Sequence, residues 1–199
     1  IKPQTGWQAA MALYAMMFND KVEFSLEGYY KKMDNYLDYK SGSVLIMNSN
    51  LADDVVETRG QAYGAEVMFK KPLGKLNGWV SYTYSRTLLQ DKQDPNSIFS
   101  VNRGEWYPAA YDKPHDVKFV GNYKFTHRYS ISMNIDYSTG RPTTIPVGKY
   151  IYGGGYRLYY SDRNAYRIPD YFRMDMALNI EPSHNLKKLS HFTITLGVY

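Results

Sequence analysis

Apolar and polar residues alternate with a period of two along most of this chain. The pattern is clearest in residues 129–138, where Tyr, Ile and Met alternate with Ser, Asn and Asp. Such alternation predicts a β-strand with one apolar face and one polar face. Further segments with this pattern begin at Val22, Tyr63, Val80, His115, Phe172 and Phe192.

Residues 7–18 are apolar on both faces and rich in Ala and Met, so a short helix and a strand both fit them. We predict a strand because the neighbouring segments are strands. This gives about eight strands in total.

The connections between the predicted strands alternate between short and long. The short turns lie near residues 19–20, 72–77, 126–128 and 182–188. Loops of roughly 18–28 residues, long for a compact soluble domain, lie near residues 40–57, 90–113 and 140–168. Short turns at one end and long loops at the other are typical of a transmembrane β-barrel. We therefore predict an all-β, antiparallel transmembrane barrel region, although alternation alone does not say which face is inside.

Composition agrees with a strand-based membrane protein. No stretch approaches the roughly 18 consecutive apolar residues of a membrane helix, but barrel strands need only every second residue to be apolar. The mean hydropathy of −0.52 therefore does not exclude a barrel. The 21 Tyr residues suit pleated strands and the boundary between membrane and water.

Charge and chain ends restrict the interpretation further. The net charge is +5, but Lys and Arg are spread along the chain without a dense basic block, so we expect no nucleic-acid partner. The absence of Cys removes disulfides and thiolate chemistry. The sequence starts at Ile1 without a visible leader and stops within an alternating run, so we expect a fragment of a longer chain.

Five motifs follow one another along the chain: GQAYGAE (60–66), GWVSYTYSR (78–86), YDKPH (111–115), TGRP (139–142) and RIPDYFRMD (167–175). Taken in this order and spacing, they resemble the C-terminal barrel region of TonB-dependent receptors, particularly those of Bacteroidetes-type bacteria. The resemblance implies an outer-membrane barrel of 22 strands, of which this chain supplies about the last third. It also implies a separate plug domain within the barrel, the protein TonB as a partner, and in some members a surface lipoprotein. The closing strand and terminal aromatic residue of such barrels are missing, so the piece should not close alone.

The function implied by this resemblance is import of a scarce nutrient, such as a siderophore, cobalamin, a glycan or a peptide. A passive porin-like barrel and a soluble secreted carbohydrate-binding β-sandwich remain alternatives. We expect no enzyme activity and no cofactor, because no nucleophile–base pair is apparent. The histidines at 115, 127, 184 and 191 lack metal-ligand spacing.

Two further segments are weak candidates for a calcium site and a phosphate-binding loop, and an ordinary loop explains each of them better. The acidic residues Asp53, Asp54 and Glu57 lack the EF-hand pattern, so a solvated loop is favoured over a calcium site. Gly153-Gly154-Gly155 lacks the context of a phosphate-binding loop and is predicted to be a flexible loop.

Two groups of residues are candidate binding sites. The first is a set of aromatic and Arg residues in the long loops, a composition suited to ligand recognition, although an aromatic girdle or packing within the loops explains them equally well. It comprises Trp106, Tyr107, Tyr152, Tyr156, Arg157 and Tyr159. The second set is polar and should face the barrel lumen and the plug, with hydrogen bonding among neighbours as the alternative. It comprises Glu66, Lys118, Asn134, Asp136, Arg173 and Asp175.

Overall fold

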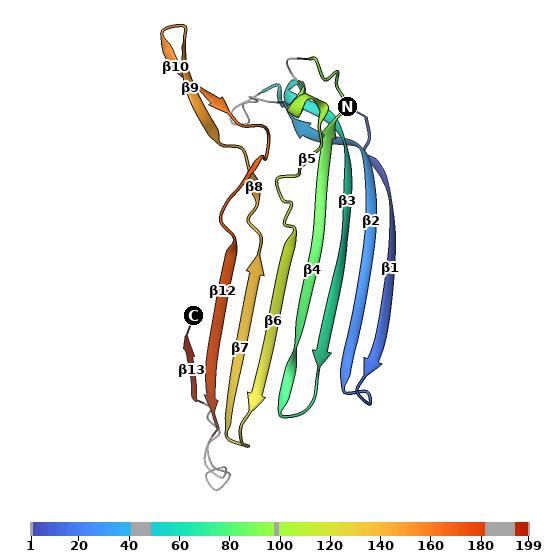
Figure 1. The fold of residues 1–199 in the computed structure, drawn as a ribbon, viewed down its shortest axis with the longest axis vertical. Helices are drawn as coiled ribbons and strands as arrows, with labels where there is room; N and C mark the ends of the chain where they lie inside the picture. The colour runs from blue at the N-terminus through green and yellow to red at the C-terminus, as the bar shows by residue number, and fades with distance from the viewer. Residues whose placement is uncertain (1, 41–48, 98–99, 182–193, 199) are drawn as a thin grey trace.

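In the computed structural model, the main part of the chain is one curved antiparallel β-sheet, with the strands side by side in sequence order (Figure 1). The structure describes residues 2–40, 49–97, 100–181 and 194–198. The strand order is β1-β2-β3-β4-β6-β7-β12-β13, and each strand in it pairs with the next. Their bounds are β1 Thr5–Met17, β2 Val22–Tyr39, β3 Val55–Lys71, β4 Leu76–Asp91, β6 His115–Lys124, β7 Tyr129–Ser138, β12 Tyr171–Ile180 and β13 Ile194–Val198.

The sheet confirms the all-β, antiparallel prediction and the expected strand number. It is open, with β1 and β13 at its two edges. The ambiguous residues 7–18 fall almost entirely in β1, whose residues pair with β2 from Thr5↔Asp34 to Met17↔Val22. The strand interpretation of this segment is therefore confirmed. The predicted turn at residues 182–188 and residue Phe192 lie outside the described residues.

The register keeps the two faces separate across the whole sheet. One row of paired positions is apolar on β2, β3, β4, β6, β7 and β12, and it runs through Leu26, Val67, Tyr82, Val117, Tyr137 and Phe172. The adjacent row, on the other face, runs through Ser25, Met68, Ser81, Lys118, Asp136 and Arg173. Because side chains alternate along each strand, the sheet has one apolar face and one mainly polar face.

The apolar face has no second layer within the described residues. Met11 is 81% exposed, Leu26 44% and Phe172 63%, although all three are large side chains paired within the sheet. A soluble β-sandwich buries such a face against another sheet. A barrel wall instead turns its apolar face to lipid and its polar face to the lumen, and this explains the exposure.

The strands differ in length. Strands β2, β3 and β4 have 18, 17 and 16 residues, whereas β6, β7 and β12 have 10 each. About 9–11 residues suffice for a tilted strand to cross a bilayer, so the longer strands extend beyond it. Alternation alone did not predict the extension of β2, because the register shifts between Met33 and Tyr36, around Asn35 with φ of 54°.

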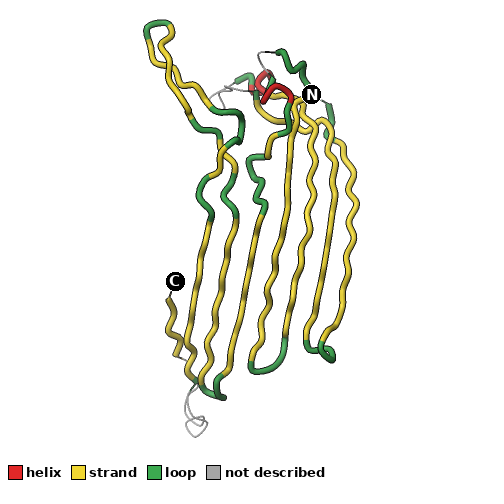
Figure 2. The backbone as a smooth tube through the Cα atoms, viewed as in Figure 1, coloured by secondary structure: helices red, strands yellow, loops and turns green. Residues whose placement is uncertain are grey.

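The long connections contain regular structure as well as irregular chain (Figure 2). Their described residues form two short 3-10 turns and five short strands. These are η1 Leu51–Asp54, η2 Val101–Gly104, β5 Tyr107–Pro108, β8 Pro142–Thr143, β9 Pro146–Tyr152, β10 Gly155–Tyr160 and β11 Tyr166–Arg167.

The prediction of a flexible loop at Gly153-Gly154-Gly155 is corrected by the structure. Gly153 and Gly154 have φ of 61° and 76° and join β9 to β10 as a tight hairpin turn, rather than a flexible loop. Positive φ at both central positions matches the twist of the flanking strands and favours Gly at both.

A small apolar core lies at the end of the sheet that carries the long connections. Val56 of β3 and Leu89 of β4 pack against Val101, Tyr107 and Ala109 of the connection between β4 and β6. Tyr36 of β2 packs against the same cluster. The core therefore fixes this connection onto the extended parts of three strands.

Candidate functional site

The six polar residues predicted to face the lumen lie on one face of the sheet. Lys118, Asp136 and Arg173 are direct partners on β6, β7 and β12. Asn134 and Asp175 are partners in the next row. Glu66 lies on β3, where its Oε2 accepts a hydrogen bond from the Thr83 hydroxyl at 3.4 Å. The register therefore places all six residues on the same face of the sheet.

Charges of both signs are interleaved along this face. Arg173 donates from Nε to both carboxylate oxygens of Asp175 at 3.0 Å, and Lys118 lies 3.7 Å from Asp116. These pairs are substantially exposed, so solvent screens them and each contributes little to stability. A hollow of about 410 Å³ lies over Lys118, Asp136 and Arg173. The face thus offers exposed charges and hydrogen-bonding groups to a contacting surface.

At the other end of the strands, Asp38 joins two long connections to β2. Its Oδ2 accepts hydrogen bonds from the Tyr107 hydroxyl at 2.6 Å and from Arg163 Nη1 at 2.9 Å. Arg163 also donates to the Tyr39 carbonyl. Burial and the Asp38 carboxylate raise the pKa of Tyr107, so this tyrosine remains a hydrogen-bond donor throughout the physiological range.

Asn102 strengthens the same junction. Its side-chain amide donates to the Arg163 carbonyl at 3.2 Å and accepts from the Arg163 backbone N–H at 2.7 Å. Asn164 donates to the Pro108 carbonyl at 2.8 Å. The connection between β7 and β12 is therefore fastened to the connection between β4 and β6.

Asp112 forms a second junction and is fully buried. Its Oδ1 accepts from the Thr87 backbone N–H at 2.7 Å, and its Oδ2 accepts from Arg167 Nη2 at 2.5 Å. Arg86 Nε lies 3.4 Å from Oδ1 as an additional ion pair. Arg167 also donates to the carbonyls of Asp112 and Gly140. A buried carboxylate requires such pairing, because its desolvation is costly.

A third carboxylate, Asp170, organises the start of β12. It accepts from the Tyr137 hydroxyl at 2.6 Å and from the Gly140 backbone N–H at 2.9 Å. These two hydrogen bonds, that of Tyr137 first, lower the pKa of the Asp170 carboxyl. The two sides of the connection between β7 and β12 are thereby held together at its base.

The β9–β10 hairpin projects beyond the sheet and separates its side chains onto two faces (Figure 1). Tyr150 pairs with Arg157, and the register places Tyr152 and Tyr159 on the same face as this pair. Tyr152 is 71% exposed and Tyr159 is 65% exposed. This Tyr/Arg face contains three of the six predicted ligand-binding residues.

The opposite face of the hairpin is more aliphatic. Tyr156 pairs with Ile151, and Leu158 pairs with Lys149. Lys149 Nζ lies 5.4 Å from the centre of the Tyr156 ring, within the range of a cation–π contact. Tyr156, a fourth predicted ligand-binding residue, therefore does not share a surface with Tyr152, Arg157 and Tyr159.

The two remaining predicted ligand-binding residues are adjacent in sequence but differ in environment. Trp106 is exposed, and the Arg59 guanidinium lies 5.8 Å from the centre of its ring. Tyr107 is 1% exposed and belongs to the small core. In this structure Tyr107 fastens a connection and presents no surface to a ligand.

Sequence reasoning missed the organising roles of Asp38, Asp112 and Asp170. Asp112 and Asp170 lie within motifs that carried the family resemblance, and this was the only available signal for them. Asp38 lies in a segment without alternation and bonds to Arg163, which is 125 positions away. No local pattern encodes a contact over that separation.

The other sequence candidates have structural contacts in the described residues. His115 begins β6, and its Nδ1 lies 2.9 Å from the Tyr82 hydroxyl. Asp53 and Asp54 belong to η1, where Lys40 donates to the Asp53 carbonyl at 2.5 Å. No group of three or more His, Cys, Asp or Glu residues in the described part of the chain is arranged to hold a metal ion.

The described residues include no helix long and apolar enough to span a membrane. The open antiparallel sheet, apolar on one face and charged on the other, has the features of a β-barrel wall. The chain belongs to the family described as TonB dependent receptor-like, beta-barrel, which matches residues 1–199. Comparison with curated proteins and with solved structures gave no match.

The family defines the general function of this domain. Its members are outer-membrane receptors that work with TonB and an internal plug domain, and they are transporters rather than enzymes. The chain is thus the barrel part of a receptor of this general type.

Proposed function

We propose that the protein imports a scarce nutrient across the outer membrane, with the Tyr/Arg face of the β9–β10 hairpin contributing to recognition of the nutrient. The observation that carries this proposal is the position of that face. It lies on an arm beyond the sheet end where the long connections meet, and its rings are exposed. Tyr, Trp and Arg side chains provide much of the binding energy in recognition surfaces.

The chemistry of this face favours some cargo classes within the range of siderophores, cobalamin, glycans and peptides. Tyr150, Tyr152 and Tyr159 offer flat rings and hydroxyl groups, while Arg157 offers a planar cation. Rings stack on planar or sugar-like groups, and a guanidinium pairs with carboxylate. We infer a cargo with both a stacking surface and an anionic group, as in an acidic glycan, a peptide or an anionic siderophore.

We further propose that the charged sheet face contacts the plug, and that Glu66, Lys118, Asn134, Asp136, Arg173 and Asp175 take part. Exposed pairs such as Arg173 with Asp175 contribute little individually. A plug held by many weak polar contacts can be retained at rest and released during transport. The C-terminal position within the barrel, a Bacteroidetes-type origin and a surface lipoprotein partner belong to the same proposal.

Transport is tested with the full-length protein in its native outer membrane. Uptake of a labelled cargo should require TonB and the proton gradient and should saturate with cargo concentration. Uptake that persists without TonB and rises linearly with concentration would instead identify a passive pore. Heat-modifiable mobility of the detergent-extracted protein checks that a closed barrel is present in each sample.

The hairpin is tested by paired substitutions on its two faces. Tyr152→Ala with Tyr159→Ala should weaken cargo binding by about tenfold or more, because each removed ring costs about 1 kcal/mol or more at a recognition surface. Tyr156→Ala with Leu158→Ala is the matched control on the opposite face and should bind normally. Equal losses from both pairs would mean that the substitutions disturb the hairpin itself, and equal binding would exclude the Tyr/Arg face.

A further inference from the structure

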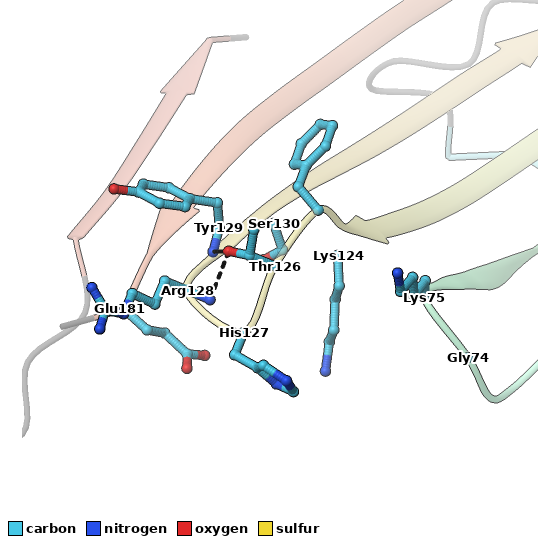
Figure 3. A pocket seen from close by; sticks show the side chains of 10 residues that line it. Gly74, Lys75, Lys124, Thr126, His127, Arg128, Tyr129, Ser130 and Glu181 are labelled. Carbon is cyan, nitrogen blue, oxygen red and sulfur yellow. Dashed lines mark hydrogen bonds between the residues drawn. The ribbon is translucent and has the colours of Figure 1, made fainter. Parts of the chain in front are cut away.

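A hollow of about 700 Å³ lies at the end of the sheet opposite the long connections. It is formed by the turn between β3 and β4, the turn between β6 and β7, and the end of β12. Figure 3 shows the side chains of Lys75, Lys124, His127, Arg128 and Glu181 around it. Basic groups therefore outnumber acidic groups in its lining.

Lys75 and Lys124 are forced together by the sheet register. Leu76 pairs with Tyr123, and the next backbone contact is from the Lys124 N–H to the Lys75 carbonyl at 2.8 Å. Like charges directly opposite each other on neighbouring strands are destabilising. Among the described residues, neither lysine has a carboxylate within ion-pair distance. Lys75 and Lys124 therefore place two positive charges without a described carboxylate partner at a position fixed by the sheet register.

Glu181 is the one acidic residue in the described lining of the hollow.

The turn that carries His127 and Arg128 is held in one conformation. Thr126 Oγ1 accepts hydrogen bonds from the backbone N–H groups of Arg128 and Tyr129, at 3.1 and 3.2 Å. The Glu181 N–H also donates to the Arg128 carbonyl at 2.8 Å. A fixed turn reduces the entropy lost when its side chains bind a ligand.

We propose that this hollow is a binding site for a phosphate group. Two ammonium groups on facing positions, with an imidazole on the adjoining turn, suit a compact multivalent oxyanion. Phe125 and Tyr129 border the hollow and are exposed, as aromatic side chains at a membrane boundary are. The phosphate comes from either of two sources, a lipid headgroup or inorganic phosphate in solution. The proposal does not depend on the nature of the imported nutrient.

The experiment uses the full-length protein in a neutral detergent. One arm titrates inorganic phosphate and pyrophosphate and measures binding by calorimetry. The other arm adds phosphatidic acid or phosphatidylcholine and measures retained lipid by native mass spectrometry. Lys75→Gln with Lys124→Gln should weaken phosphate binding by about fivefold for each lysine removed. Lys31→Gln with Lys113→Gln removes two exposed lysines elsewhere and should leave it unchanged.

Lys75→Glu separates binding from folding. The introduced carboxylate would pair with Lys124, so this variant should assemble and resist heat at least as well as the wild type, yet lose phosphate binding. If the wild type binds inorganic phosphate and Lys75→Glu does not, the source of the phosphate group is the free anion. Lysine-dependent retention of phosphatidic acid without binding of inorganic phosphate assigns the lipid headgroup.

Two results would overturn the proposal. One is the absence of lysine-dependent binding in both arms. The other is a loss of heat resistance in Lys75→Glu without any phosphate binding by the wild type, because it would mean that a carboxylate from elsewhere in the protein occupies the hollow.

Discussion

Single carboxylates organise the connections above the sheet. Asp38 holds Tyr107 and Arg163, Asp112 holds Arg167 and the Thr87 N–H, and Asp170 holds Tyr137. Each joins segments that are distant in sequence. Substitution of one such residue should therefore loosen a whole connection while the sheet stays intact.

Replacing Tyr107 with Phe removes a hydrogen bond to a carboxylate and preserves the ring in the core. We expect the local stability of the connection between β4 and β6 to fall by about 1–2 kcal/mol. Hydrogen exchange of the full-length protein should show faster exchange in residues 100–112. Tyr111→Phe is the control, because the Tyr111 and Tyr36 hydroxyls are 3.4 Å apart and form only a weak contact. Equal exchange in the two variants would contradict a fastening role for Tyr107.

Replacing Asp112 with Asn should have a larger effect. The Asp112 side chain is fully buried, and its loss leaves Arg86 and Arg167 without their shared counter-charge. Removing one partner of a buried ion pair costs about 3–5 kcal/mol. Limited proteolysis should cut the variant rapidly near residues 139–170. Asp162→Asn, which removes an exposed pair with Arg103, should be cut at the wild-type rate.

At the scale of elements, the β9–β10 hairpin is a small unit with its own turn geometry. Strand pairing and two glycines define it, while the contacts at its base orient it. The conformation of the hairpin therefore depends on the positive φ angles of its turn glycines. The direction in which it projects depends on the hydrogen bonds of Asp38, Asp112 and Asp170.

The turn can be tested without introducing a clash. A Cβ at either Gly154 or Gly155 would meet no atom within 4 Å, but only Gly154 has a positive φ, of 76°. Gly154→Ala should destabilise the hairpin by about 1–2 kcal/mol, whereas Gly155→Ala should be nearly neutral. Hydrogen exchange at Tyr156 and Leu158 measures the difference. A neutral result for Gly154→Ala would show that the turn tolerates another conformation.

The sequence predicted the strands of membrane-spanning length, but it did not predict the structure of the connections beyond them. Residues 129–138 coincide with β7 because alternation is a local consequence of contact with two different environments. The extension of β2 and the short strands of the connections depend on bulges, turns and distant side chains. The grouping of Lys118, Asp136 and Arg173 follows from strand parity, whereas the burial of Tyr107 depends on a partner 69 positions away.

At the scale of the whole molecule, the distribution of apolar residues is inverted relative to a soluble protein. The buried core is confined to one end, and the large apolar side chains of the sheet are exposed on one face. Stability of the sheet must therefore depend on lipid and on neighbouring strands more than on internal packing.

A matched pair of arginine substitutions tests this assignment of faces. Ile135 lies in the middle of β7 on the apolar face, and Asn134 is its neighbour on the polar face. Ile135→Arg should cost about 2–4 kcal/mol if it faces the bilayer midplane, whereas Asn134→Arg should be tolerated. The amount of heat-modifiable barrel in outer membranes reports assembly. Equal assembly of the two variants would refute the assignment.

The rim of the molecule is the end of the sheet that carries the long connections. Because the strands differ in length, its two sides differ in stiffness. Along β3 and β4, a continuous ladder of backbone hydrogen bonds extends into the rim, and β2 pairs with β3 again beyond its bulge, so bending this side would break many bonds together. Along β7 and β12, the ladder ends at Ser138 and Tyr171, and the chain above is held by the two-residue pairing of β8 with β11, a few further backbone bonds and a few side chains. A bound molecule that competes for those few bonds can swing the hairpin at a cost of a few kcal/mol, within the range of ordinary ligand affinity. The rim is therefore stiffer along the extended β3 and β4 than above β7 and β12. A molecule bound between these two parts would displace the β9–β10 hairpin rather than the extended strands.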